Sequence, residues 1–188
     1  MPDTRRFLTA LRRVIRSLPT PSGGDSARPA AATSSDAAWR PPADDGEEWP
    51  GRTGPSATVE LDPADVRRVR FAYTPERDGE PDPGEVVWTW VPYEERDGRG
   101  KDRPVAVVAA GTEGRFLAVQ LTSKPQNGNG DAVALGAGAW DGEGRPSWAR
   151  IDRVFLVHAE GMRREAASLD AERYALLVDA LAARYGWG

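Results

Sequence analysis

The sequence contains no cysteine, and His158 is its only histidine. Without thiols the chain can form neither a disulfide framework nor a thiolate metal site. A single histidine also argues against a histidine-based metal cage. We therefore predict a protein that uses no metal ion and no other cofactor.

Long apolar runs are also missing from the chain. No stretch of about 18 apolar residues could form a membrane-spanning helix. The N-terminus lacks the apolar core of about 7–15 residues that marks a secretory signal peptide. We expect a soluble, cytoplasmic protein, and the length of 188 residues predicts one domain with additional chain.

The net charge of −4 is unevenly distributed along the chain. Residues 1–18 contain five arginines and one aspartate, which gives +4. Residues 56–188 contain 17 basic and 22 acidic residues, which gives −5. A mildly acidic domain argues against broad electrostatic binding to duplex nucleic acid, although it leaves room for a local basic groove.

The basic segment 1–18 has apolar residues at three-and-four spacing, which predicts an amphipathic helix that ends before Pro19. Two interpretations stay open. The helix could dock weakly on an anionic membrane surface or on a partner protein. Alternatively, it is a marginal helix that packs loosely on its own domain or frays, since isolated helices this short are barely stable.

Residues 19–55 are dominated by Pro, Gly, Ser, Ala and acidic side chains and lack large aliphatic residues. Such a composition buries too little apolar surface to offset the loss of conformational entropy on ordering. We expect a disordered linker here and a folded domain from residue 56 to 188.

The domain carries closely spaced strand patterns and one clear helix. Asp62 followed by Pro63 fits the start of a short helix, and Asp170 and Gly186 fit the cap and the end of a C-terminal helix. Five segments alternate or run apolar as strands do: 85–91, 103–110, 115–123, 132–137 and 148–158. The pattern predicts a small, partly closed barrel or a bent sheet whose open side is covered by the helix.

Several short motifs in this order resemble the PemK/MazF family of toxin ribonucleases over residues 83–185. They are "PGEVVW" at 83–88, Arg103-Pro104 before a valine-rich strand, "LTS" at 121–123 and "SLDAERY" at 168–174. The resemblance implies a mainly β fold, an SH3-like, partly open β-barrel with a C-terminal α-helix, and a homodimer. It also implies metal-independent cleavage of single-stranded RNA through attack by the ribose 2′-hydroxyl, and restraint by a cognate antitoxin protein.

By the same resemblance, Arg103 and Thr122 are the catalytic residues. A guanidinium offers a planar fork of donors that matches phosphate geometry and keeps its charge. A threonine hydroxyl at the end of a strand can add one fixed hydrogen bond to the same oxygens. Ser123, Lys124 and Lys101 are candidate substrate-binding residues beside them.

Without the resemblance, Arg103 would be an ordinary exposed arginine and Thr122 an ordinary strand residue, with the candidate substrate-binding residues belonging to loops. His158 could serve as a general acid or base, but a structural role is more common for a lone histidine. Family members carry a "QIRTVDKSRL"-like segment where this chain has "RVFLVHAEGM", with Phe155 and His158 in place of the arginine and aspartate. The alternative function is a catalytically inactive protein-interaction module on the same barrel, for example an inhibitor of a cellular enzyme.

Overall fold

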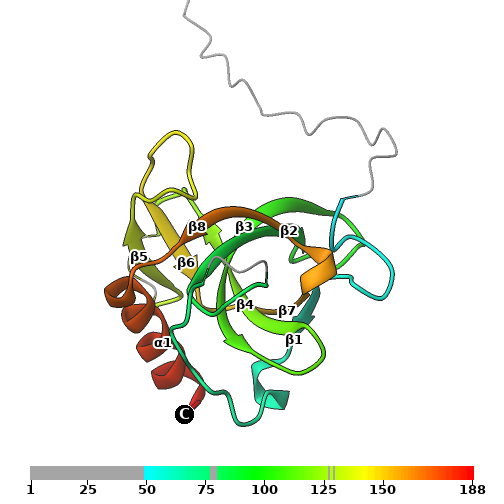
Figure 1. The fold of residues 1–188 in the computed structure, drawn as a ribbon, viewed down its shortest axis with the longest axis horizontal. Helices are drawn as coiled ribbons and strands as arrows, with labels where there is room; N and C mark the ends of the chain where they lie inside the picture. Colours follow the sequence, from blue (N-terminus) through cyan, green and yellow to red (C-terminus); the bar gives the residue numbers. More distant parts are fainter. Residues whose placement is uncertain (1–48, 77–79, 127, 129) are drawn as a thin grey trace, which may run out of the picture. The chain divides into compact units, whose positions relative to one another are not determined.

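A computed structural model describes residues 49–76, 80–126, 128 and 130–188 (Figure 1). The predicted N-terminal helix at 1–18 lies outside the described residues, as does the part of the predicted linker up to residue 48.

The described chain forms a mainly β fold built on one bent antiparallel sheet (Figure 1). The strands follow the order β1-β7-β4-β3-β2-β8, and β6 branches off by pairing with both β4 and β5. No pairing joins β1 to β8 in the described residues, so the barrel is partly open, as predicted. The strands are β1 (Val59–Leu61), β2 (Glu85–Pro92), β3 (Gly100–Ala110), β4 (Arg115–Thr122), β5 (Ala132–Gly136), β6 (Ser147–Arg150), β7 (Val154–His158) and β8 (Arg163–Ser168).

The sequence predicted five strands, and the described residues form eight. The segment 148–158 is divided into β6 and β7 by a break at 151–153. The strand β8 escaped prediction because it lies at the end of the sheet, buries only Ala167 and is otherwise polar or small. The three-residue strand β1 is too short to show a periodic pattern.

The C-terminal helix α1 (Ala171–Tyr185) begins and ends where the sequence predicted. The side chain of Asp170 accepts a hydrogen bond from the backbone N–H of Arg173 at 2.8 Å. Gly186 ends the helix in the left-handed conformation, with φ of 70°. The helix buries Tyr174, Leu177 and Leu181 against one core of the domain. No helix in the described ranges is long and apolar enough to cross a membrane.

The sheet buries apolar side chains on both of its faces. On one face Val87 and Val105 belong to a core formed with β7, and on the other Val86 and Ala106 belong to the core under α1. Burial on both faces explains why β3 has a continuous apolar run instead of an alternating pattern. The run begins only after residue 104, so the preceding residues of β3 extend beyond the core.

Residues 49–52, which the composition assigns to the linker, pack onto the sheet, whereas residues 53–55 are exposed. Gly51 is buried, and its carbonyl accepts a hydrogen bond from the N–H of Thr58 at 2.8 Å. The carbonyl of Pro50 accepts one from the N–H of Trp90 at 3.1 Å. The packed part of the chain therefore includes residues 49–52 as well as 56–188. Composition missed this packing because it uses backbone groups and a glycine instead of large apolar side chains.

Candidate active site in the groove between diverging strands

A groove opens where β3 and β4 separate. The last residue pair between these strands is Val105 with Gln120, and beyond it Thr122 pairs with Trp148 of β6 instead. Pro104 has no backbone N–H to extend the ladder, which suits a strand at the point where it loses a neighbour. The resulting groove has a volume of about 390 Å³.

All five residues singled out from the sequence line this groove. They are Lys101, Arg103, Thr122, Ser123 and Lys124. Arg103 on β3 and Thr122 on β4 each lie two residues beyond the last pair between these strands, Val105 with Gln120, so each projects from the same face as that pair. Residues opposite one another on antiparallel strands project from the same face. The fold thus brings together residues that are 19 positions apart in the sequence.

Arg103 is half-buried and lies among other cations. Its guanidinium carbon is 6.0 Å from the ring centroid of Tyr93. Burial lowers the pKa of Arg103, and the nearby charges of Arg150 and Arg153 lower it further, while Tyr93 and Glu94 oppose the shift. Within the described ranges no carboxylate lies at ion-pair distance from Arg103.

The neighbouring arginines differ from Arg103 because carboxylates neutralise them. Arg150 pairs with Glu94 at 2.7 Å and also with Asp152. Arg153 pairs with Glu60 at 2.6 Å. Arg103 is therefore a half-buried cation close to other positive charges, and a bound anion would reduce the electrostatic repulsion between them.

Two lysines extend the positive side of the groove. Burial lowers the pKa of Lys101, and the charges of Arg103 and Lys124 lower it further. The acids that line the groove are already engaged: Asp102 pairs with Arg163 at 2.9 Å, and Asp141 and Glu143 both pair with Arg145 at 3.1 Å. The mutual repulsion of the cations favours a bound anion such as a phosphate group.

Thr122 holds a defined local geometry at the end of β4. Its hydroxyl oxygen accepts a hydrogen bond from the backbone N–H of Lys124 at 3.2 Å. A hydroxyl that accepts one bond still has a proton to donate. Ser123 and Lys124, which follow, are exposed at the rim of the groove.

The lining of the groove also contains residues that sequence reasoning did not select. Trp88 comes from β2, and Trp140 comes from the loop between β5 and β6. Arg163 lies 5.7 Å from the ring centroid of Trp88 and binds Asp102. Asp102 Oδ1 and Trp140 Nε1 are buried without a hydrogen-bond partner among the described residues. No local pattern marks these positions, since only the divergence of the strands brings them to one groove.

His158 and Phe155 lie outside the groove. His158 pairs with Arg115 at the start of β4, seven residues from Thr122, which corresponds to about 23 Å along the strand. Phe155 is fully buried in a core, and the guanidinium of Arg153 lies 4.9 Å from its ring centroid. The position that carries an arginine in the family pattern is thus part of the core here, with an arginine two residues earlier.

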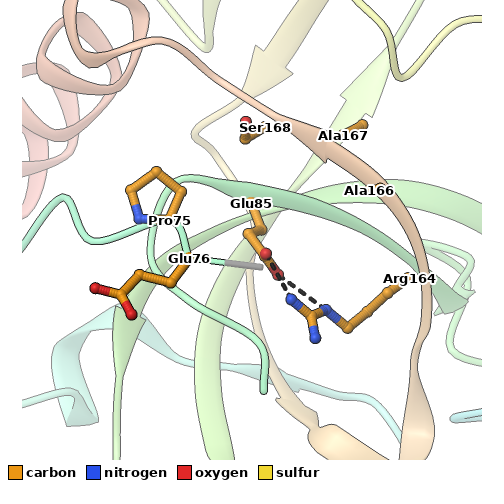
Figure 2. Close-up of a pocket in the computed structure, with 7 residues that line it drawn as sticks. All are labelled: Pro75, Glu76, Glu85, Arg164, Ala166, Ala167 and Ser168. Carbon is orange, nitrogen blue, oxygen red and sulfur yellow. Dashed lines mark hydrogen bonds and ion pairs between the residues drawn. The ribbon is translucent and has the colours of Figure 1, made fainter. Parts of the chain in front are cut away.

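A second cavity, of about 270 Å³, lies between β8 and the segment that precedes β2. Figure 2 shows Glu85 and Arg164 facing one another across it. Arg164 donates hydrogen bonds of 3.0 and 2.6 Å to the two carboxylate oxygens of Glu85, so this pair satisfies itself. In the described part of the chain no group of three or more His, Asp or Glu side chains could hold a metal ion.

Fold and groove together describe a small, partly open β-barrel with a cationic, aromatic-walled cleft. The model of the PemK-like, MazF-like toxins of type II toxin–antitoxin systems matches residues 82–184, which is more than half of the chain. The chain belongs to this toxin family.

Solved structures of MazF proteins resemble the chain at low identity. The MazE–MazF complex of Deinococcus radiodurans shows 20% identity over 58% of this chain and 98% of that chain, with a TM-score of 0.43. MazF from the same organism shows 22% identity over 57% and 97%, with a TM-score of 0.44. The Mycobacterium tuberculosis toxin MazF-mt6 shows 14% identity over 54% and 98%, with a TM-score of 0.40. Among curated proteins, none matches the chain.

Proposed function

We propose that this protein is the toxin of a toxin–antitoxin system and an endoribonuclease that cleaves single-stranded RNA. The observation that carries the proposal is the half-buried Arg103, which lacks a carboxylate partner among the described residues and lines the same groove as Thr122. Lys101 and Lys124 line the same groove and add positive charge for the phosphate backbone.

The proposed chemistry needs only charge and hydrogen bonds from the protein. The 2′-hydroxyl oxygen attacks phosphorus, and the bond from phosphorus to the 5′-oxygen breaks. The products are a 2′,3′-cyclic phosphate and a 5′-hydroxyl, so the proton lost at the 2′-oxygen is balanced by one gained at the 5′-oxygen. Arg103 neutralises the charge that grows on the non-bridging oxygens, and Thr122 donates a hydrogen bond to one of them.

The aromatic wall supports a preference for single strands. Trp88 is half-buried, so part of its ring is available to a base that has left its stack. Bases in a duplex are already paired and stacked and could not enter a groove of this volume.

The partners follow from the family and are part of this proposal. A cognate antitoxin would occupy the cationic groove and exclude RNA, and two copies of the chain would form a homodimer. The site of action would be the cytoplasm, where the RNA substrate is.

The direct test incubates the purified full-length protein with a mixed-sequence single-stranded RNA and maps the new ends. We expect 5′-hydroxyl and cyclic-phosphate ends, the same products in the presence of a metal chelator, and no cleavage of the same RNA in a duplex. Intact RNA under all conditions would overturn the nuclease and favour the interaction module. Loss of cleavage with the chelator would contradict the metal-independent mechanism.

Replacing Thr122 with alanine is expected to slow cleavage by about 10- to 100-fold. A hydrogen bond to a charged group contributes about 1.5–3 kcal/mol, and the guanidinium of Arg103 remains in the variant. The single-turnover rate constant is the measurement, and Thr112→Ala, an exposed threonine near the other end of β4, is the control. Equal rates in the two variants would show that the Thr122 hydroxyl has no part in the reaction.

A further inference from the structure

Glu60 connects the segment that precedes the family-matched residues to the candidate site. It belongs to β1, and in the register of β1 with β7 it lies opposite Phe155. One of its carboxylate oxygens accepts a hydrogen bond from Arg153 at 2.6 Å. The other accepts one from Arg96 at 3.4 Å. Glu60 thus engages a buried arginine and an exposed one at the same time.

Both arginines interact with the loop between β2 and β3, residues 93–99, or with the residue from which it starts. Arg96 is in the middle of this loop, and its side chain is otherwise exposed. Arg153 donates a second hydrogen bond, of 2.9 Å, to the carbonyl of Pro92, the residue from which the loop starts. The Glu60 carboxylate therefore holds the loop at two points. It binds Arg96 in the middle of the loop directly, and it holds Pro92, where the loop starts, through Arg153.

The loop leads directly into the candidate catalytic strand. Its first residue, Tyr93, lies against Arg103, and the Tyr93 N–H donates a hydrogen bond to the carbonyl of Arg99 at 3.0 Å. The loop is not among the segments that line the groove. Its position therefore affects the orientation and environment of Arg103 more than the space open to RNA.

We propose that Glu60 is a positioning residue that clamps the loop 93–99 and thereby holds Tyr93 against Arg103. This inference rests on the proposed function of the groove. The clamp belongs to a strand outside residues 82–184, so this chain completes its site with a segment that the family model does not include. The clamp is stable because Arg153 is buried, and a buried arginine that loses its carboxylate is strongly unfavourable.

The carboxylate is ionised at neutral pH, as the clamp requires. The hydrogen bond from Arg153 lowers the pKa of Glu60 below its ordinary value, and the charges of Arg153 and Arg96 lower it further. A group whose pKa is lowered in the folded state stabilises the fold above its ordinary pKa. The clamp therefore persists at neutral pH and is lost as the pH falls through the lowered pKa of Glu60.

Hydrogen–deuterium exchange of the full-length protein tests the clamp without reference to RNA. The measurement follows the peptide 92–101 in the parent, in Glu60→Gln and in Arg96→Gln. Arg99→Gln is the matched control, because Arg99 is in the same loop but its ion pair among the described residues is with Asp97, also in the loop, at 2.7 Å.

We expect exchange in this peptide to be about two- to fivefold faster in Arg96→Gln, the range expected for an exposed ion pair. Glu60→Gln should show an increase at least as large, and Arg99→Gln, which removes an ion pair within the loop only, should show a clearly smaller one. Exchange at the parental rate in Arg96→Gln, or equal acceleration in the control, would overturn the clamp. Arg96→Gln keeps the test decisive if Glu60→Gln fails to fold, because Arg96 is exposed.

RNA cleavage provides a second readout that a purely structural role would not change. We expect kcat to fall several-fold in Glu60→Gln and Arg96→Gln while KM stays within about twofold, since the loop does not line the groove. Unchanged kcat in both variants, with Arg103→Ala inactive, would overturn the clamp and leave the nuclease intact. If the parent does not cleave RNA, the exchange rates still decide whether the clamp exists.

Discussion

Replacing Arg103 with alanine should reduce the rate of RNA cleavage by at least about 10²–10³-fold. Loss of one donor that stabilises the charge of a transition state typically has an effect of this size. Arg103→Lys should recover little activity, because an ammonium group is a point charge and cannot replace the planar fork of donors. The single-turnover rate constant on a fixed RNA measures both effects.

The fold should survive this substitution. Burial and the charges of Arg150 and Arg153 lower the pKa of Arg103, so the folded state disfavours its charge. Removing the guanidinium relieves this repulsion, and the thermal midpoint should not fall. Circular dichroism of each variant confirms that a loss of activity is not a loss of structure.

Arg145→Ala is the matched control for Arg103→Ala. Arg145 lines the same groove, but Asp141 and Glu143 neutralise it. We expect its removal to change the cleavage rate by about twofold or less, since exposed ion pairs contribute little. Equal losses in the two variants would mean that the groove needs positive charge in general. Parental activity in Arg103→Ala would show that the site assignment is wrong.

Replacing Gly51 with alanine should lower the free energy of unfolding by about 4 kcal/mol and the thermal midpoint by about 10 °C. Gly51 has φ of 78°, which an alanine adopts only at a cost. A Cβ at this position would lie 2.6 Å from the carbonyl oxygen of Gly161 and 2.7 Å from Oγ1 of Thr58, and closer still to Oγ1 of Thr89. The backbone carbonyl cannot move aside without displacing the turn before β8.

Gly54→Ala separates the backbone conformation from the collision. Gly54 has φ of 79°, but a Cβ there would meet no atom within 4 Å. This control should lose only about 1–2 kcal/mol, the penalty for the left-handed conformation. Thermal denaturation compares the two variants. If they melt at the same temperature, residues 49–58 are not packed against β2 in the way the structure shows.

The sequence alone determined the elements whose signals are local. Asp170 and Gly186 define the C-terminal helix because capping depends on residues within one turn. The apolar runs define β2, β3 and β4 because burial requires apolar side chains at successive positions. Arg103 and Thr122 were selected through a resemblance to short family motifs, and their catalytic roles stay a prediction.

Only the tertiary structure decided how the groove is formed. The separation of β3 from β4 depends on the pairing of Thr122 with Trp148, which is 26 residues away in the sequence. That separation brings Trp140 and Asp102 to the groove, and neither has a local pattern that marks it. A strand can pair with partners that are distant in the sequence, so the pattern of neighbouring residues does not determine which partner it takes.

The segment before β2 is a second case in which local sequence did not predict the tertiary contacts. The composition of residues 49–55 predicts disorder, yet Gly51 packs closely because Thr89 and Gly161 lie beside it. Glu60 likewise gains its two arginine partners from β7 and from the loop 93–99. Composition indicates how much apolar surface a segment could bury. The contacts of Gly51 and Glu60 depend instead on the absence of a Cβ and on paired charges. Their contribution to stability is set by the atoms that the fold places around them.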